Sequence, residues 1–410
     1  MIAVLKQVRI QNFKVIEDTG LLPIQPLMAI IGRNGSGKSS LVEAIDWLGR
    51  TAAEDAETAT EPFQRIRDVI NGWDEDPGRT FSITLVFDSQ DSSLGGDLVY
   101  RVEVGSDRDG IVPQIRSEEL SGAERGELSF LIRTEPTTGA RQYRIMPEDF
   151  GEFLWGTASD PQKLALVNLR GSSNRAGLLL YEFLTCAVFL RLNPRMIASF
   201  SPPRARPSPR LLDEEGSRLA HLLGTFDEEL LAILVEKLAN ILQRADRLEA
   251  HQPNGPADRR FFTLSEQRGP DAPPLQIPAW TLSEGTRRIT AILAPLLADN
   301  PPPLLCIEEV ENGLDPWTIK YLLDELAAAV VRGTQVVVTS HSPYLLNMLP
   351  LPSIMFCSRP GHTVEFAAGD QLPDLDVIQQ RMGPGDLYAN RYFHRSLEER
   401  SNEDRDSVRG

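Results

Sequence analysis

The sequence predicts an α/β fold that carries an antiparallel β lobe and an inserted helical subdomain, and it predicts no long coiled coil. Apolar runs typical of buried strands recur towards both ends of the chain, with helical spacing after each. Residues 80–145 contain alternating apolar and polar positions, which favours antiparallel strands. Residues 162–250 have helical spacing over a few turns only, without a sustained heptad array. The buried-type runs are Leu27–Ile31, Pro303–Ile307 and Gln335–Ser340.

The first part of the chain predicts strand, strand, tight turn and helix in that order. Val4–Ile10 alternates and Leu27–Ile31 is fully apolar, so both are expected to be strands. Helical spacing over Ser39–Leu48 predicts a helix. Glu54–Thr60 is acidic and rich in alanine and threonine, which predicts a surface loop.

The middle of the chain is harder to divide. Leu178–Leu190 predicts a buried helix, because Glu182 interrupts it and it is shorter than the ~20 apolar residues of a membrane span. Helical periodicity continues over Leu219–Leu248. The proline-rich stretch Ser201–Pro209 favours an extended connector, with a nucleic-acid contact through its arginines as the alternative. Short strands are expected at Phe81–Phe87, Leu98–Val104, Phe130–Arg133 and Gln142–Ile145.

These patterns predict four regions. Residues 1–160 form a first lobe with the antiparallel strands, and residues 161–260 form a helical insertion. Residues 261–370 form a second lobe of alternating strands and helices, and residues 371–410 form a charged C-terminal tail.

Composition sets limits on the function. The 410 residues include 42 basic and 58 acidic side chains, so the formal net charge is -16. This charge counts against a uniformly basic nucleic-acid face, although a local patch would suffice for DNA. The three cysteines, Cys186, Cys306 and Cys357, form no disulfide framework and lack zinc-ligand spacing. With no apolar block of a signal peptide at the N-terminus, we expect a cytoplasmic protein that does not bind membranes.

The segment Gly32–Ser39, GRNGSGKS, carries the clearest chemistry. It matches GxxxxGK[ST] between an apolar strand and a helix, which is the context of a phosphate-binding loop. Its glycines let backbone amides surround phosphates at a helix N-terminus. Lys38 is expected to reach the β- and γ-phosphates, and the Ser39 hydroxyl to ligate Mg²⁺.

A second group of residues follows the later strands. The apolar run that begins at Pro303 ends in Glu308 and Glu309. Glu308 is expected to hold Mg²⁺, and Glu309 to orient or deprotonate an attacking water. His341 ends the strand Gln335–Ser340, where it could sense the γ-phosphate.

Two helix starts accompany these residues. Ser283 is a natural N-cap ahead of an apolar-periodic helix, and Gly285 permits the close approach of a phosphate. Asp315 and Pro316 have the types expected at an N-cap and first helical position, after an Asn-Gly turn.

In this order, the motifs resemble those of the ABC-type ATPase superfamily in its RecF/SMC/OLD-like branch, and most closely short bacterial AAA-family ATPases. Gly32–Ser39 resembles the Walker A motif and Leu282–Thr286 the signature motif. Cys306–Glu309 is similar to the end of Walker B, Asn312–Asp315 to the D-loop, and His341 to the switch histidine. The resemblance implies an ABC-type P-loop ATPase head; it covers both ends of that head and fades through the middle.

The resemblance also implies the site residues. Lys14 ends a segment similar to the family's first strand, where a basic residue often lies near the nucleotide. Glu309, His341 and Lys38 are the implied catalytic residues, and Ser39, Glu308 and Asn168 the implied Mg²⁺ ligands, with Gln162 as the alternative to Asn168. The implied ATP contacts are Lys14, Gly32, Asn34, Gly35, Ser36, Gly37, Lys38, Ser39, Ser40, Ser283, Gly285 and Asp315. The chain departs from the family in its Ser283-Glu-Gly signature and its Glu-Glu carboxylate pair.

The implied mechanism is a dimer, or a higher oligomer, in which two heads hold ATP between one chain's Walker motifs and the other's signature. An engine or sensor that acts with a separate nuclease or effector, in phage defence or DNA transactions, is the leading hypothesis, because no Toprim-type Glu and Asp-x-Asp set follows His341. The alternative is a RecF-like repair or recombination protein that binds DNA itself. A transporter subunit is disfavoured by the long interval between Ser39 and Leu282.

Overall fold

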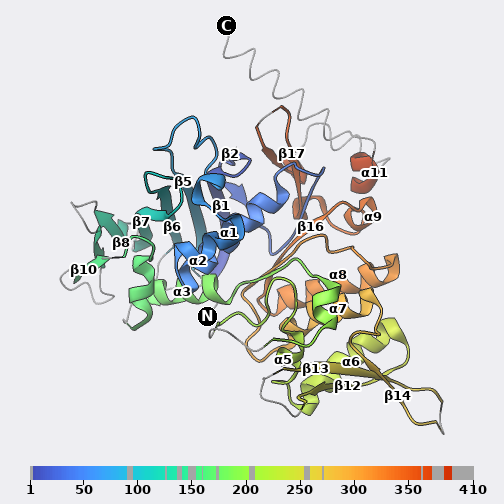
Figure 1. The fold of residues 1–410 in the computed structure, drawn as a ribbon. Helices are drawn as coiled ribbons and strands as arrows, with labels where there is room; N and C mark the ends of the chain where they lie inside the picture. The colour runs from blue at the N-terminus through green and yellow to red at the C-terminus, as the bar shows by residue number, and fades with distance from the viewer. Residues whose placement is uncertain are drawn as a thin grey trace. The chain divides into compact units, whose positions relative to one another are not determined.

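The computed structural model divides the chain into two compact units (Figure 1). The first unit combines Met1–Thr185 with Leu349–Gly410, and the second is Cys186–Met348. The four-region division along the chain remains a prediction. The residues described are 3–89, 96–124, 127–135, 141–145, 154–158, 160–171, 175–202, 208–253, 259–269, 272–361, 363–371 and 383–389.

A nine-stranded antiparallel sheet is the largest element of the first unit (Figure 1). Its strand order is β10-β9-β8-β7-β6-β5-β1-β2, and β3 also pairs with β1. Consecutive strands β5 to β10 pair with their neighbours in sequence, as the alternating pattern predicts. The strands are β1 (Ala3–Phe13), β2 (Ile16–Asp18), β3 (Leu22–Pro23), β5 (Phe81–Ser89), β6 (Asp97–Ser106), β7 (Pro113–Glu124), β8 (Glu127–Glu135), β9 (Arg141–Ile145) and β10 (Leu154–Ala158).

Helix α1 (Lys38–Ala53) packs against β1 and β5 of this sheet. The indole of Trp47 on α1 meets Phe81 edge to face at a centroid distance of 5.1 Å, and Phe81 meets Phe13 in the same way at 5.3 Å. Burial of these rings fixes the helix, and therefore the loop that precedes it, on the sheet. The other helices of this stretch are α2 (Ala56–Thr60), η1 (Glu61–Phe63), η2 (Ile66–Asp68), η3 (Ala165–Gly171) and α3 (Arg175–Cys186).

The first unit contains three further strands, and one of them, β4, leads into the glycine-rich loop. Strand β4 (Leu27–Gly32) runs parallel to β17 (Ile354–Ser358), which pairs antiparallel with β18 (Glu365–Ala368). Strand β4 is apolar throughout and almost fully buried, as expected for a parallel strand. The remaining elements of this unit are η4 (Leu351–Ser353), η5 (Gly369–Gln371) and α11 (Pro384–Ala389).

The second unit contains a parallel set of buried strands. Strand β15 (Leu304–Ile307) pairs with both β11 (Val188–Leu190) and β16 (Gln335–Ser340). Parallel strands end at the same edge, so the residues after β11, β15 and β16 are neighbours. The helices of this unit are α4 (Pro194–Ala198), α5 (Leu219–Leu223), α6 (Glu228–Leu242), α7 (Glu284–Leu297), α8 (Pro316–Val331) and α9 (Pro343–Leu346).

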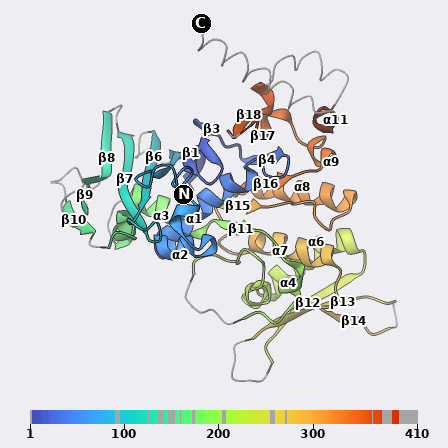
Figure 2. The same cartoon turned by 45° about the horizontal axis from the view of Figure 1, so that its top comes forward.

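A small antiparallel sheet, β12-β13-β14, completes the second unit, and α6 lies along β12 (Figure 2). Exposed aromatic rings of Phe200 and Trp280 lie near Phe261 on β13, at centroid distances of 5.5 and 5.4 Å. The strands are β12 (Ala245–His251), β13 (Phe261–Glu266) and β14 (Leu275–Pro278).

The fold class predicted from the sequence is confirmed, and the described residues contain no long coiled coil. Three local predictions are wrong. Residues 56–60 form α2 rather than a loop, because the Asp55 carboxylate caps it by accepting a bond from the Thr58 amide. The buried run at 178–190 is divided between α3 and β11. The helical pattern at 219–248 ends at Leu242, where Gln243 has a positive φ, and β12 follows. Most of the proline-rich connector, residues 203–207, and the tail 396–410 lie outside the described residues.

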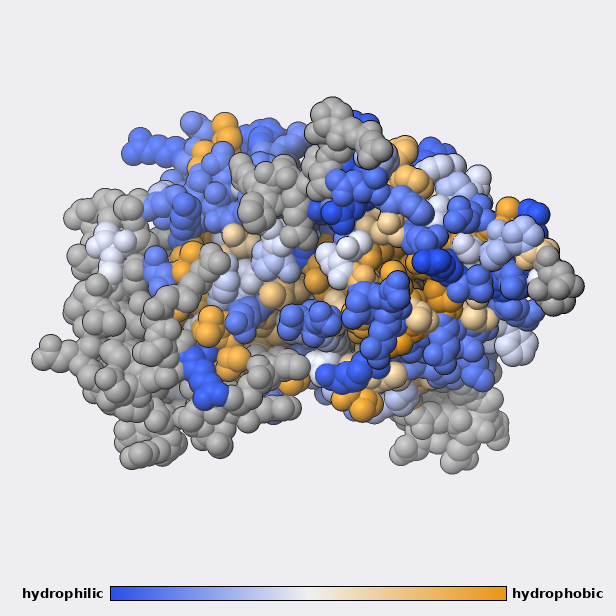
Figure 3. Space-filling view, turned by 90° about the horizontal axis from the view of Figure 1, so that it is seen from below, coloured by the Kyte–Doolittle hydropathy of each residue, from blue (hydrophilic) through white to orange (hydrophobic). Residues whose placement is uncertain are grey.

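Among the residues that are coloured by hydropathy in Figure 3, hydrophilic ones alternate with groups of hydrophobic ones. Among the helices described, none combines the length and the apolar character needed to cross a membrane. Cys186, Cys306 and Cys357 form no disulfide with one another in the structure.

Candidate nucleotide site

The phosphate loop, Gly32–Ser39, connects β4 to α1 in the first unit. Gly37 occupies the N-cap of α1 with a φ of 112°, a conformation that a side chain would strain, and it has no side chain to cap the helix. A helix N-terminus that lacks a side-chain cap is a position where backbone amides can bind an anion. Gly32 is required for space, because a Cβ there would lie 2.1 Å from the Cys357 carbonyl oxygen. Ser39 and Ser40 lie in the first turn of α1, and Asn34 and Gly35 are exposed at the tip of the loop.

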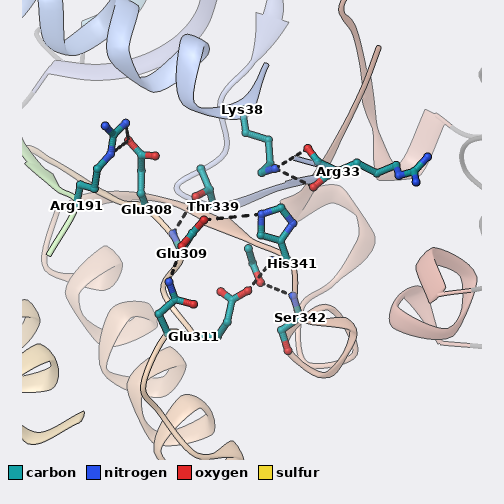
Figure 4. Close-up of polar contacts among 12 residues, drawn as sticks. Arg33, Lys38, Arg191, Glu308, Glu309, Glu311, Thr339, His341 and Ser342 are labelled. Carbon is teal, nitrogen blue, oxygen red and sulfur yellow. Dashed lines mark hydrogen bonds and ion pairs between the residues drawn. The ribbon is translucent and has the colours of Figure 1, made fainter. Parts of the chain in front are cut away.

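The Lys38 side chain of the phosphate loop bonds to the loop's own backbone carbonyls, and the Ser36 side chain is buried beside them. The buried Lys38 ammonium donates to the carbonyls of Gly32 at 2.8 Å and Arg33 at 3.0 Å (Figure 4). The Ser36 hydroxyl is buried, and no partner for it occurs among the described residues. Burial raises the pKa of the Cys357 thiol to about 11, so it stays protonated and donates to the Ser36 carbonyl at 3.1 Å. An unpartnered hydroxyl and a lysine within a cradle of backbone amides fit a polyphosphate.

Two other residues predicted for this site lie elsewhere in the first unit. Lys14 has a positive φ of 52°, and its ammonium pairs with Glu43 on α1 at 2.5 Å. Asn168 is exposed in η3. That helix is held at its start by Glu118 of β7, whose carboxylate accepts bonds from backbone amides. Gln162, the alternative to Asn168, is half-buried, and its carbonyl accepts a bond from the Ala56 amide. Their predicted roles therefore remain predictions.

The carboxylate edge, Glu308–Glu311, follows β15 in the second unit. Glu308 is half-buried and pairs with Arg191, which directly follows β11, at 2.7 Å (Figure 4). The Glu308 amide also donates to the Leu190 carbonyl at 2.8 Å. The parallel pairing of β11 and β15 brings these residues together, since both come at the ends of paired strands. Sequence reasoning missed Arg191; its position directly after an apolar run was the available signal.

Glu309 has an unusual backbone conformation. Its φ is 48°, in the left-handed region that costs a non-glycine residue about 1 kcal/mol or more. Its amide donates to the Thr339 hydroxyl at 3.0 Å, and Thr339 is buried on β16. Its exposed carboxylate accepts a bond from the Asn312 amide group (Figure 4). Strain of this kind persists only where surrounding contacts hold it, and it concentrates at functional sites.

His341 lies beside the Glu309 carboxylate, with 4.0 Å between its Nε2 and Oε1 of Glu309 (Figure 4). The His341 backbone amide donates to Glu311 Oε1 at 2.5 Å, so the first residue after β16 is tied to the carboxylate edge. The other Glu311 oxygen is buried without a partner in the described part of the chain. The structure therefore brings together Glu309 and His341, which are 32 positions apart in the sequence.

The two predicted helix starts adjoin each other in the second unit. Ser283 caps α7 by accepting a bond from the Thr286 amide at 3.1 Å. Gly285 packs so closely on the Gly313 carbonyl that a Cβ would lie 2.6 Å from it. Asp315 caps α8, and three donors hold its carboxylate: the Thr318 hydroxyl and the amides of Trp317 and Thr318. Bonding from Thr318 lowers the pKa of Asp315. The capping predictions are confirmed, and the segments predicted as signature and D-loop form one surface.

Oxygen donors are what Mg²⁺ requires, and the residues predicted to bind it supply them. Ser39 offers a hydroxyl, Glu308 a carboxylate and Asn168 an amide oxygen. No group of three or more histidine, cysteine, aspartate or glutamate residues in the described parts could hold a metal ion. Mg²⁺ commonly takes only one or two protein carboxylates and completes its shell with phosphates and water. The chemical type of each of these donors therefore fits a metal that arrives with a nucleotide.

Comparison with known families identifies the class of protein. A family described as AAA ATPase domain matches residues 4–266, and a second, described as an AAA domain, matches residues 195–347. This chain belongs to the AAA ATPase domain family. The membership, together with the relatives below, confirms the predicted relationship to ABC-type ATPases of the RecF/SMC/OLD-like branch.

The curated relatives of this AAA ATPase domain protein are matched over short segments. The chromosome partition protein Smc of Coxiella burnetii is 36% identical over 109 residues, which is 26% of this chain and 9% of the relative. The OLD nuclease of Thermus scotoductus is 37% identical over 84 residues, which is 20% of this chain and 14% of the relative. The match therefore spans less than a sixth of either relative.

Solved structures agree with the fold. An SMC head bound to the C-terminal winged-helix domain of ScpA has a TM-score of 0.52 at 14% identity, over 89% of this chain and 97% of that one. The Smc head of Pyrococcus furiosus, bound to the C-terminal domain of ScpA, has a TM-score of 0.50 at 12% identity, over 92% of this chain and 99% of that one. At such identities the likeness concerns the fold alone.

Proposed function

We propose that this AAA ATPase domain protein binds Mg·ATP on the phosphate loop and hydrolyses it with the carboxylate edge. The single observation that carries the proposal is Glu309, an exposed carboxylate held in a strained backbone conformation beside His341. A general base must accept a proton from water while its position stays fixed, and the contacts from Asn312 and Thr339 supply that fixation.

Each residue has a distinct task in the proposed reaction. The Lys38 ammonium exchanges its hydrogen bonds to the loop carbonyls for contacts with the phosphates of ATP. The backbone amides at the start of α1 bind phosphate oxygens. Glu309 orients and deprotonates the attacking water, and His341 donates a hydrogen bond to the γ-phosphate. Ser39 and Glu308 would hold Mg²⁺, which neutralises phosphate charge when it is bound. Arg191 pairs with Glu308 at 2.7 Å and with Glu214 at 3.8 Å, so it would keep a carboxylate partner if Glu308 held a metal.

We further propose that the site is completed by a second copy of the chain through Ser283 and the adjoining D-loop. Trp317, next to Asp315 at the start of α8, has 80% of its surface exposed. Tryptophan is enriched among the residues that contribute most to protein interfaces. This exposure supports an interface at the D-loop.

The biological role is proposed from the relatives. The similarity to an OLD nuclease supports an engine or sensor that acts with a nuclease or other effector on a separate chain, in phage defence or DNA transactions. DNA is a further candidate partner of that assembly.

A Glu309→Gln variant tests the enzymatic proposal. The amide cannot accept the proton, so we expect hydrolysis to fall about a thousandfold while ATP binding persists. Light scattering with ATP and Mg²⁺ should then show a stable dimer, which Trp317→Ala added to the same variant should weaken at least about tenfold. Hydrolysis at the wild-type rate by Glu309→Gln would contradict the assignment of the base, and a monomer at all concentrations would contradict head pairing.

A further inference from the structure

Arg288 is a buried arginine that the proposed reaction does not use. It lies in the second turn of α7, five residues after Ser283, and is 4% exposed. Its Nη1 donates to the Leu192 carbonyl and its Nη2 to the Glu309 carbonyl, each at 3.1 Å. Burial lowers the pKa of Arg288, while the carboxylates of Glu284, Glu309 and Glu311 act in the opposite direction.

A buried guanidinium is costly, because it loses its hydration. The two carbonyls that accept hydrogen bonds from Arg288 come after different strands: Leu192 follows β11, and Glu309 follows β15. The planar guanidinium reaches the two carbonyls with two separate nitrogens at a fixed spacing, whereas a lysine would have to reach both from a single nitrogen.

The Glu309 backbone is held on both sides. Its amide is bonded to Thr339, and its carbonyl accepts bonds from Arg288 and from the Asn312 amide. A left-handed conformation at a glutamate reverts to a relaxed one unless such contacts oppose the change. The Asn312 bond belongs to the same turn as Glu309, so Arg288 and Thr339 are the two anchors that come from other elements.

We propose that Arg288 is a positioning residue that holds Glu309 in its left-handed conformation and thereby places the carboxylate beside His341. The effect on catalysis rests on the proposed function, whereas the effect on the backbone of Glu309 does not. Because Arg288 lies on the helix that Ser283 caps, the same contact joins the signature segment to the catalytic carboxylate.

Hydrogen exchange tests the backbone claim in the protein without nucleotide. In an Arg288→Met variant we expect faster amide exchange in the peptide that contains Glu309, Val310 and Asn312. Lys237→Met is the matched control: it removes a cation, paired at 2.6 Å with Glu325, that links α6 to α8. The control should leave that peptide unchanged. Unchanged exchange in Arg288→Met, or an equal increase throughout Cys186–Met348, would overturn the proposal.

Kinetics test the link to catalysis. Arg288→Met should lower kcat at least about tenfold with little change in ATP affinity, because a small displacement of a base is costly for rate but not for binding. Arg288→Lys should recover part of the loss, and Thr339→Val should reproduce it from the amide side. In a Glu309→Gln background, Arg288→Met should cause no further loss, since both act through one group.

The two proposals fail in different ways. A full additional loss of rate in the Glu309→Gln background would show that Arg288 acts independently of Glu309, which overturns the positioning role. Wild-type hydrolysis that does not depend on Glu309 would contradict the proposed function, and the exchange experiment would then decide the inference alone.

Discussion

The phosphate loop and the carboxylate edge are held in place in different ways. The loop is fixed by its backbone: a buried strand, a helix N-terminus, and two glycines that a Cβ would disrupt. The carboxylate edge is fixed by side chains that come from several elements, including Arg191, Arg288 and Thr339. Backbone amides supply fixed donors for phosphate oxygens, whereas a side-chain network can hold one carboxylate in a strained conformation.

The difference implies that substitutions in the loop change binding and that substitutions at the edge change rate. Lys38→Ala should give the largest effect on binding, with ATP affinity lowered about a hundredfold or more, because the ammonium is the loop's charged contact to the phosphates. Titration with a fluorescent ATP analogue measures it, with Lys320→Ala on the exposed side of α8 as the control. Unchanged affinity for the ATP analogue would show that Lys38 of the phosphate loop does not contribute to ATP binding.

A substitution at the edge should behave in the opposite way. His341→Ala should slow single-turnover hydrolysis about a hundredfold, because one oriented donor to a developing charge is lost, and should leave ATP affinity within a few-fold of wild type. His251→Ala, in the small sheet of the second unit, serves as the control. A large loss of affinity with an unchanged rate would show that the two regions do not divide binding and chemistry in this way.

The same difference explains what the sequence could predict. The glycines, lysine and serine of the phosphate loop are consecutive, and the strand before them and the helix after them have clear periods, so both the element and its chemistry were predicted. The caps at Ser283 and Asp315 are also local, and both predictions are confirmed. The pairings of Arg191 with Glu308 and of Arg288 with Glu309 could not be predicted from local pattern, because the partners lie 117 and 21 positions away.

The wrong predictions have a related cause. The periodicity of Leu219–Leu248 is helical on both sides of Gln243, yet the chain leaves the helix there and pairs with β13. That choice depends on a partner strand rather than on local spacing. Residues 178–190 are apolar both where they form α3 and where they form β11. The length of the apolar run therefore does not show where the helix ends and the strand begins.

Loss of the α8 cap should produce the smallest effect. Asp315→Ala should lower the free energy of unfolding by about 1 kcal/mol at neutral pH. The folded-state pKa of Asp315 is lowered from 3.8, so its contribution is present above that value and is lost as the pH falls through the folded pKa. Urea unfolding at several pH values should show the deficit shrink in acid, with Asp324→Ala as the control. A deficit that does not change with pH would contradict the capping role of the charged carboxylate.

A complementation experiment tests most directly whether one active site combines two copies of the chain. Lys38→Ala and Ser283→Arg should each be inactive alone, the first through the phosphate loop and the second through the exposed signature serine. In a mixed dimer, one of the two shared sites contains an intact Lys38 and an intact Ser283 from different chains. We predict that mixing the two inactive variants restores Mg·ATP hydrolysis. A mixture no more active than its separate components, while dimerisation persists, would contradict a shared site.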